Sequence, residues 1–355
     1  MAEPWAGRPT ARFCAEGDEV SSRTAEELVV ELVSVVFSFR NEEENIAELI
    51  ARTIAALDKS NVRRELIFVN DCSDDRSGEI LDHYAKQDST IKIINMARRC
   101  GVSPCALAGF AHSSGDAVVY MDADLQDPPE LIPQLIQEWR KGCDVVNTTR
   151  LVRLGETRTK MFMTKLGYRL IGLLSDTDIP MNTGDFKLLS RRVVNELLKL
   201  NEYDPFLRGL VRWVGFKQTQ IFYDRQPRHA GLSHFQWHSK DSAKAMVAGI
   251  TSFGSYPLYL SFIVGLFVSL GAFVYLTAII ISRLVWNMHL PGWPSEMVTM
   301  LFLGGLNLLS SGILSIYVAR ISREVKRRPN WIVESVVNLE AIKHQEQTAD
   351  SLERT

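Results

Sequence analysis

The stretch AVVYMDADLQDPPE, residues 117–130, joins a short apolar run to a dense cluster of acidic residues. Its first part, Ala117 to Met121, has the composition of a short buried β-strand. Asp122 and Asp124 follow directly, which puts both carboxylates at the carboxyl end of that strand. Two carboxylates separated by one residue can reach one hard cation, and Mg²⁺ or Mn²⁺ prefers oxygen ligands and keeps substrate phosphates in its shell. The stretch therefore predicts a strand that ends in a metal and phosphate site.

The sequence around this stretch alternates between two periodicities. Short β-rich runs occupy residues 33–37, 66–69, 91–94 and 117–121, and helical patterns occupy residues 42–57, 78–87 and 103–113. Strands that alternate with helices predict an α/β fold with an open, mostly parallel sheet. In such sheets ligands bind at the carboxyl ends of the strands.

Polar clusters follow two further strands, at residues 38–43 and 70–75. Asp and Asn favour turns for local reasons, so either cluster alone could be only a turn. Three clusters on one edge of a sheet favour a binding site instead. A dinucleotide site would need Gly-x-Gly-x-x-Gly after the first strand, where this chain has Phe-Arg-Asn-Glu, and the Walker lysine loop is also absent.

The charged residues nearly balance, but their distribution along the chain is uneven. The 355 residues include 40 Lys and Arg against 42 Asp and Glu, so no global charge attracts nucleic acid, and we expect no nucleic-acid partner. Residues 258–282 and 297–319 contain no charge, and each run exceeds the roughly 20 residues that cross a bilayer as a helix. The alternative is a pair of buried core helices, which are usually shorter and carry a polar face. The sequence predicts two transmembrane helices.

Cations gather after the second span. They are Arg320, Arg323, Lys326, Arg327 and Arg328. The loop at 283–296 holds one Arg and one Glu, so the positive-inside rule predicts a multi-pass protein of the cytoplasmic (inner) membrane with its catalytic domain in the cytoplasm. The predicted organisation is a mobile tail at 1–30, a catalytic domain at 31–234, an interfacial amphipathic helix at 235–256, two transmembrane helices within 257–320, and a cytoplasmic tail at 321–355.

Three motifs carry a family resemblance. RNEE at 40–43, NDCS at 70–73 and DADLQDPPE at 122–130 resemble family 2 glycosyltransferases with the GT-A fold. More closely, residues 33–333 are similar to polyisoprenyl-phosphate glycosyltransferases, which include dolichol-phosphate mannose synthase and bacterial undecaprenyl-phosphate glucosyltransferases. Further matching stretches are GDFKL at 184–188, FLRGL at 206–210, WVGF at 213–216, RHAGLS at 228–233 and RPNWIV at 328–333.

The chain departs from the family pattern at a few positions. Ser38 and Arg40 stand where the family usually has Pro and Tyr, Arg99-Cys100 where it often has Asn-Phe, and His234 where it usually has Lys. These departures leave the sugar and some phosphate contacts open.

The resemblance implies a role for each matching residue. Asp122 and Asp124 would hold Mg²⁺ or Mn²⁺ and the donor diphosphate, and Asp185 would lie near the donor sugar, where the family's acidic residue is sometimes proposed as a base. Residues implied on the donor side are Asn41, Glu42, Asp71, Arg98, Asp122 and Gln126. Those implied at the acceptor phosphate are Arg150, Lys160, Thr164, Arg228 and Ser233. Asp185 and Asp124 are the candidate catalytic residues. The cationic segment 149–165 would otherwise be a basic, solvated helix face.

The resemblance also implies the reaction. One sugar would pass, with inversion, from a nucleotide-sugar, first of all UDP-glucose, to a polyprenyl phosphate for modification of cell-envelope glycans such as lipopolysaccharide O-antigen. GDP-mannose or an amino-sugar donor is an alternative. So are a processive polysaccharide synthase, although Gly209 stands where its Gln-x-x-Arg-Trp motif needs Gln, and a non-enzymatic scaffold. Glycine-bearing spans would permit a homo-oligomer.

Overall fold

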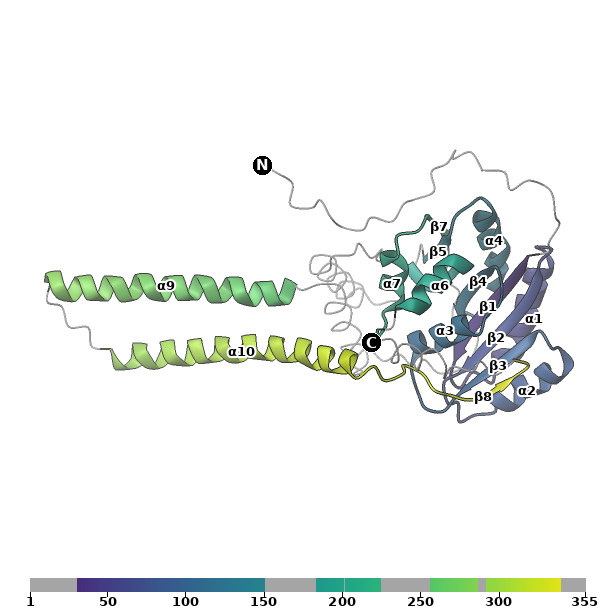
Figure 1. Cartoon of the computed structure of the whole chain (residues 1–355), viewed down its shortest axis with the longest axis horizontal. Helices are drawn as coiled ribbons and strands as arrows, with labels where there is room; N and C mark the ends of the chain where they lie inside the picture. Colours follow the sequence, from purple (N-terminus) through teal and green to yellow (C-terminus); the bar gives the residue numbers. More distant parts are fainter. Residues whose placement is uncertain (1–30, 151–182, 201, 225–255, 287–291, 340–355) are drawn as a thin grey trace, which may run out of the picture.

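The computed structural model describes residues 31–150, 183–200, 202–224, 256–286 and 292–339, and in them one eight-stranded sheet is the centre of the α/β domain (Figure 1). The strands are β1 (Leu32–Phe39), β2 (Arg63–Asn70), β3 (Ile91–Met96), β4 (Ala117–Asp122), β5 (Val145–Arg150), β6 (Thr183–Ser190), β7 (Gln218–Tyr223) and β8 (Val333–Val337). The helices are α1 (Ile46–Asp58), α2 (Ser77–Gln87), α3 (Val102–Ala111), the short 3₁₀ helix η1 (Pro129–Leu131), α4 (Ile132–Arg140), α6 (Arg191–Lys199), α7 (Leu207–Trp213), α9 (Tyr256–Trp286) and α10 (Trp293–Val325).

The strand order is β7-β5-β6-β4-β1-β2-β3-β8. The pairs β1/β2, β1/β4, β2/β3 and β5/β7 are parallel, whereas β6 runs antiparallel to both β4 and β5, and β8 runs antiparallel to β3. The predicted α/β fold with a mostly parallel sheet is confirmed, and the four strands and three helices expected between residues 33 and 121 are all present.

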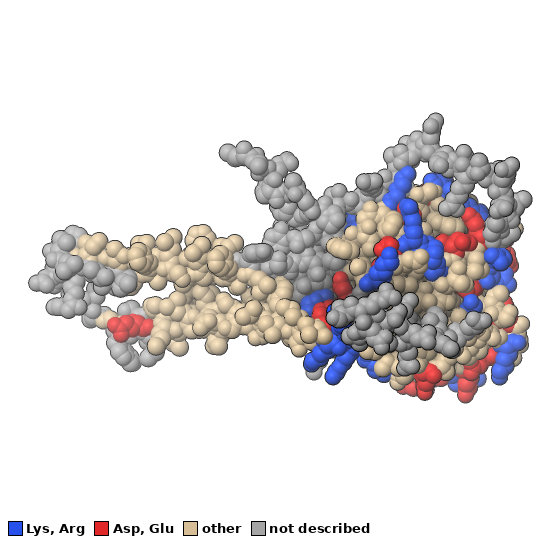
Figure 2. Space-filling model, viewed as in Figure 1, with Lys and Arg blue, Asp and Glu red and all other residues tan. Residues whose placement is uncertain are grey.

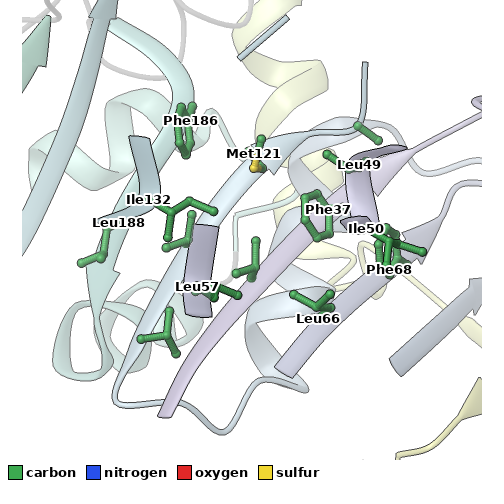
Figure 3. Close-up of a cluster of buried hydrophobic side chains, with 14 of the residues drawn as sticks. Phe37, Leu49, Ile50, Leu57, Leu66, Phe68, Met121, Ile132, Phe186 and Leu188 are labelled. Carbon is green, nitrogen blue, oxygen red and sulfur yellow. The ribbon is translucent and has the colours of Figure 1, made fainter. Parts of the chain in front are cut away.

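Helices cover both faces of the sheet, and the alternation of side chains along each strand supplies two apolar clusters. Val35 and Phe37 of β1 pack against α1, α2 and α4, while Val36 between them packs against α3, α6 and α7. Figure 3 shows the first cluster, in which Phe37 and Phe68 stack with ring centroids 4.6 Å apart. Because both faces are buried, the central strands are continuously apolar, as expected for a parallel sheet.

The chain returns from α10 to the sheet. β8 lies along β3 and places the side-chain amide of Asn95 3.0 Å from the Ser335 hydroxyl. Just beyond it, the Asn338 amide donates to the carbonyls of Ala85 and Ile91, at 2.7 and 2.9 Å. Ser335 and Asn338 belong to the segment 321–355, for which the sequence predicted only a cytoplasmic tail. The segment that follows α10 is thereby built into the sheet of the α/β domain.

Helices α9 and α10 extend away from the domain, side by side (Figures 1 and 2). Phe262, Phe267, Met300 and Leu308 are 67–77% exposed, so the two helices present an extensive apolar surface. In the described part of the chain, one helical stretch, Thr299–Val325, is long and apolar enough to cross a membrane. The first of the two predicted spans is not confirmed by this criterion.

The domain-proximal end of α10 contacts the loop before α7. The backbone N–H of Tyr203 donates to Glu324 at 3.0 Å, and the Arg323 guanidinium lies 5.5 Å from the Tyr203 ring centroid. Arg320 pairs with Glu202 at 3.9 Å. These contacts connect α10 to the loop that leads into α7, so they help to set the position of α7 relative to α10.

A buried carboxylate holds the opposite, amino-terminal edge of the sheet together. Glu65 on β2 is 3% exposed and accepts hydrogen bonds from Ser34, Lys92 and Ser114, the last through both its N–H (2.6 Å) and its hydroxyl (2.9 Å). Desolvation acts to raise the pKa of Glu65, but these hydrogen bonds outweigh it, and the net pKa lies below the ordinary glutamate value. The folded protein therefore favours the ionised form of Glu65.

Glu65→Gln is expected to lower the free energy of unfolding by about 2 kcal/mol, because it removes hydrogen bonds to a charged acceptor and leaves Lys92 unpaired. Thermal melting of the detergent-solubilised protein measures this loss. Since the folded pKa is depressed, the contribution is full above the ordinary pKa of about 4.3 and disappears as the pH falls through the lower folded pKa. The difference between wild type and variant should shrink in that window. Glu79→Gln, which removes an exposed partner of Arg76, is the control and should be neutral within about 0.5 kcal/mol.

Several predictions from sequence fall outside the described residues. They are the tail at 1–30, the interfacial helix at 235–256 except its last residue, the residues Lys160, Thr164, Arg228 and Ser233, and the chain beyond residue 339. The domain boundaries drawn from the sequence remain predictions.

Candidate active site

The carboxyl edge of the sheet collects unusual backbone conformations. Asn41, Cys72 and Leu125, which follow β1, β2 and β4, have φ angles of 55°, 55° and 57°. Left-handed conformations are unfavourable for residues with a side chain and persist where surrounding structure enforces them, often at functional sites. Their presence after three neighbouring strands supports a binding site at this edge, where the sequence predicted one.

Asp71, at the end of β2, holds the entrance of α3. Its carboxylate accepts the backbone N–H groups of Cys100 at 2.6 Å and Gly101 at 3.0 Å, and it is 8% exposed. Gly101 has a φ of 93°, which glycine adopts without strain. The residue proposed to contact the nucleotide base is thus also a support for the loop beside it.

Arg98 precedes the same loop and reaches the segment after α10. Its Nη2 donates to the carbonyls of Pro329 at 3.2 Å and Asn330 at 3.4 Å. The family resemblance predicted that Arg98 lies near the donor. In the structure, Arg98 also connects the loop before α3, which Asp71 supports, to the segment that follows α10.

Asn41 and Glu42 fasten the loop after β1 to the loop after β2. The N–H of Asn41 donates to the Ser73 hydroxyl at 3.0 Å, and the Asn41 side-chain oxygen accepts the N–H of Asp74 at 3.0 Å. The N–H of Glu42 donates to the Ser77 hydroxyl at 3.0 Å. Their implied role toward the donor remains a prediction, because these contacts show a structural one.

Asp122 and Asp185 meet at the join between β4 and β6. Tyr120 on β4 pairs with Lys187 on β6, and continuing that antiparallel register sets Asp122 opposite Asp185. Desolvation and the neighbouring charges of Asp185, Asp124 and Asp127 raise the pKa of Asp122 above its usual range. The edge therefore carries an excess of negative charge that favours a cation.

Asp185 is paired rather than free. Nε of Arg208, on α7, donates to Asp185 Oδ1 at 2.7 Å, and Nη2 donates to the other oxygen. Burial acts to raise the pKa of Asp185, but the Arg208 guanidinium outweighs it and holds that pKa well below the usual range. An ionised carboxylate with both oxygens bound to one arginine is poorly placed to be a strong base and well placed to orient a ligand.

Asp122 and Asp124 fit a hard divalent cation as oxygen donors beside several like charges. Asp124 also accepts the backbone N–H of Gln126 at 3.1 Å, which fixes the turn that carries both residues. In the described residues no group of three or more His, Cys, Asp or Glu side chains could hold a metal ion by itself. Mg²⁺ commonly binds through one or two carboxylates and completes its shell with substrate phosphates and water, which this donor set allows.

Arg150 brings a positive charge to the same edge. It is the last residue of β5 and lies opposite Tyr223 of β7. Its Nη2 approaches Asp127 Oδ2 at 3.5 Å, and its Nε donates to the Tyr223 hydroxyl at 3.2 Å. Of the predicted acceptor residues, Arg150 is the one within the described residues, and it joins the acidic cluster at one edge of the sheet.

Four residues at this edge were not predicted from sequence as site residues. Arg208 and Lys187 lie in stretches quoted for the family resemblance, but nothing local assigns them a role. Lys187 is 1% exposed, and burial lowers its pKa to about 8. A lysine flanked by Phe186 and Leu188 was the available signal. Asp127 lies in the DADLQDPPE stretch at 122–130, which by itself assigned it no role, and Tyr223 lies in none of the quoted motifs.

Known proteins resemble this chain over most of its length. The family described as Glycosyl transferase family 2 matches residues 34–198. An uncharacterized glycosyltransferase of Synechocystis sp. is 39% identical over 88% of this chain and 98% of its own. A prophage-derived bactoprenol glucosyl transferase of Shigella flexneri is 37% identical over 85% of this chain and 97% of its own.

Solved structures of glycosyltransferases are more distant. Glucosyl-3-phosphoglycerate synthase from Mycobacterium tuberculosis, in complex with Mn²⁺, UDP-glucose and phosphoglyceric acid, is 20% identical, covers 69% of this chain and 87% of its own, and has a TM-score of 0.43. The relatives of 37–39% identity, aligned over nearly their whole length, show that the chain belongs to glycosyltransferase family 2 and is a glycosyltransferase with a GT-A α/β domain.

Proposed function

We propose that this enzyme transfers one sugar from a nucleotide-sugar to a polyprenyl phosphate, with inversion, at the cytoplasmic face of the membrane. The observation that carries the proposal is that an acidic cluster around Asp122 and a held arginine, Arg150, meet at one edge of the sheet. The first suits a metal-bound donor diphosphate and the second suits an acceptor phosphate. Relatives named bactoprenol glucosyl transferase, in Shigella flexneri and Shigella phages, support a polyprenyl acceptor and glucose.

On the donor side, Asp122 and Asp124 would hold Mg²⁺ or Mn²⁺. The ion, when bound, would stabilise the charge that develops on the departing nucleotide diphosphate. Asp71 is proposed to contact the base, with Asn41, Glu42, Arg98 and Gln126 around the donor. UDP-glucose is the proposed donor, and GDP-mannose or an amino-sugar nucleotide is the alternative.

On the acceptor side, little base catalysis is needed. The second pKa of a phosphate monoester is near 6, so most of the acceptor is already an anionic nucleophile at neutral pH. Arg150 would hold this anion near the donor diphosphate and reduce their repulsion, together with Lys160, Thr164, Arg228 and Ser233. Asp185, ionised and fixed by Arg208, would orient a sugar hydroxyl. Attack on the anomeric carbon from the face opposite the diphosphate would convert an α-linked donor into a β-linked product.

The membrane arrangement is part of the proposal. Both α9 and α10 would cross the inner membrane, with the α/β domain in the cytoplasm. Support comes from the uncovered apolar surface of both helices and from the cations at the domain-proximal end of α10 (Figure 2). The contacts of Glu202 and Tyr203 with α10 would then keep the site near the headgroups, where the acceptor phosphate lies. Association of these helices in a homo-oligomer is a further expectation.

Membranes that contain the enzyme, incubated with radiolabelled nucleotide-sugars, distinguish the candidate functions. Transfer of one sugar to organic-extractable lipid, from one donor of the set, is expected. A labelled polymer would indicate a processive synthase, and no incorporation from any donor would indicate a non-enzymatic protein. Either of the last two results would overturn the proposal. The donor that labels the lipid identifies the sugar.

A further inference from the structure

Arg150 is held by two residues from other elements. Its Nε donates to the Tyr223 hydroxyl at 3.2 Å, and its Nη2 faces Asp127 Oδ2 at 3.5 Å. The Tyr223 hydroxyl in turn donates to the other oxygen of Asp127. The three side chains form a closed ring of polar contacts in which each member touches the other two.

The ring is built from three separate parts of the fold. Asp127 lies in the turn after β4, Arg150 ends β5, and Tyr223 ends β7, in parallel register with Arg150. On another side the guanidinium lies against Gly184, where an added Cβ would be 3.3 Å from Arg150 Nη2. The arginine is enclosed, so little side-chain freedom remains to be lost when a ligand binds.

The charges explain why the arginine needs a fixed partner. Asp127 is fully buried, and an unpaired carboxylate there would be strongly unfavourable. Arg150 also exerts its charge on Asp185, so without Asp127 it would be drawn toward the acidic cluster of the donor site. Asp127 and Tyr223 engage Nη2 and Nε, whereas Nη1 makes no hydrogen bond within the part of the chain that the structure describes. The Nε and Nη2 edge of the Arg150 guanidinium is therefore occupied, and Nη1 is left for a ligand.

We propose that Asp127 and Tyr223 are positioning residues, which hold Arg150 in the orientation that receives the phosphate of the acceptor lipid. The inference rests on the proposed function and goes beyond it, because neither residue itself needs to touch the substrate. It assigns the Tyr223 hydroxyl a role in acceptor affinity and not in the chemistry of transfer.

Tyr223→Phe tests this inference. Loss of one hydrogen bond to the guanidinium should raise the KM for polyprenyl phosphate about five- to tenfold. The kcat and the KM for the nucleotide-sugar should stay within about twofold. Tyr120→Phe is the matched control, because it removes a buried tyrosine hydroxyl that lies 2.8 Å from Ser38 Oγ at the same sheet. It should lower thermal stability comparably and leave the KM for the lipid unchanged.

A double-mutant cycle separates positioning from a general structural effect. If Tyr223 acts through Arg150, Tyr223→Phe should add no further increase in the acceptor KM in an Arg150→Lys background. An unchanged acceptor KM in Tyr223→Phe, with a raised one in Arg150→Lys, would overturn the positioning role and leave the acceptor role of Arg150 intact. An unchanged acceptor KM in both variants would overturn both assignments. Wild-type enzyme that transfers no sugar to lipid would contradict the proposed function and this inference with it.

Discussion

Asp124→Asn is expected to reduce sugar transfer about a thousandfold. The substitution keeps the size of the side chain and removes a carboxylate proposed to hold the divalent cation. A loss of about 4 kcal/mol of charge stabilisation in the transition state corresponds to that factor. Steady-state transfer by the purified enzyme, at saturating Mg²⁺ and Mn²⁺, measures it.

Asp116→Asn is the matched control for this substitution. Asp116 precedes β4 as Asp124 follows it, and it accepts the N–H of Leu32 at 2.9 Å at the opposite edge of the sheet. It should lower stability without lowering transfer. Near wild-type turnover of Asp124→Asn at saturating metal would show that Asp124 does not hold a required ion.

Asp185→Asn is expected to lower kcat about a hundredfold, the loss that a misplacement of about 1 Å at the reacting centre can cause. The amide cannot accept two hydrogen bonds from Arg208 as the carboxylate does, so both the proposed sugar contact and the position of α7 would be weakened. The KM for the nucleotide-sugar should rise less than kcat falls. Single-turnover kinetics with excess enzyme measure the chemical step.

Asp144→Asn is the corresponding control, because Asp144 forms a bidentate ion pair with Arg192 just before the amino-terminal end of β5. It breaks the same kind of ion pair away from the carboxyl edge. Loss of stability with full transfer is expected of it. Equal loss of transfer in both variants would mean that Asp185 acts through fold stability and not at the reacting sugar.

The sequence was sufficient for the central part of the fold because its signals there are local. β1, β2, β3 and β4 are short apolar runs between helical patterns, and parallel connection puts their carboxyl ends together. Asp71, Asp122 and Asp124 could therefore be assigned to one edge before any coordinates. Their residue types at strand ends were enough.

The remaining features depend on pairing between distant segments, which leaves no periodic signal in a single sequence. β8 pairs with β3 although more than 230 residues, including α9 and α10, separate the two strands. Arg208 and Asp185 are 23 residues apart, and Tyr223 and Asp127 are 96 apart. Asp185 was expected near the donor from the family resemblance, but Arg208 and Tyr223 alone look like ordinary surface residues. The antiparallel insertion of β6 between β4 and β5 brings Asp185 and Tyr223 to the sheet edge that carries Asp122 and Asp127.

Mass spectrometry of lipid extracted after reaction of the purified enzyme with polyprenyl phosphate and UDP-glucose tests the central claim most directly. The expected product is polyprenyl phosphate that carries a single hexose, which a β-glucosidase releases and an α-glucosidase does not, and which is absent with Asp124→Asn. Unmodified polyprenyl phosphate with every nucleotide-sugar supplied, or a lipid that carries a chain of sugars, would contradict it.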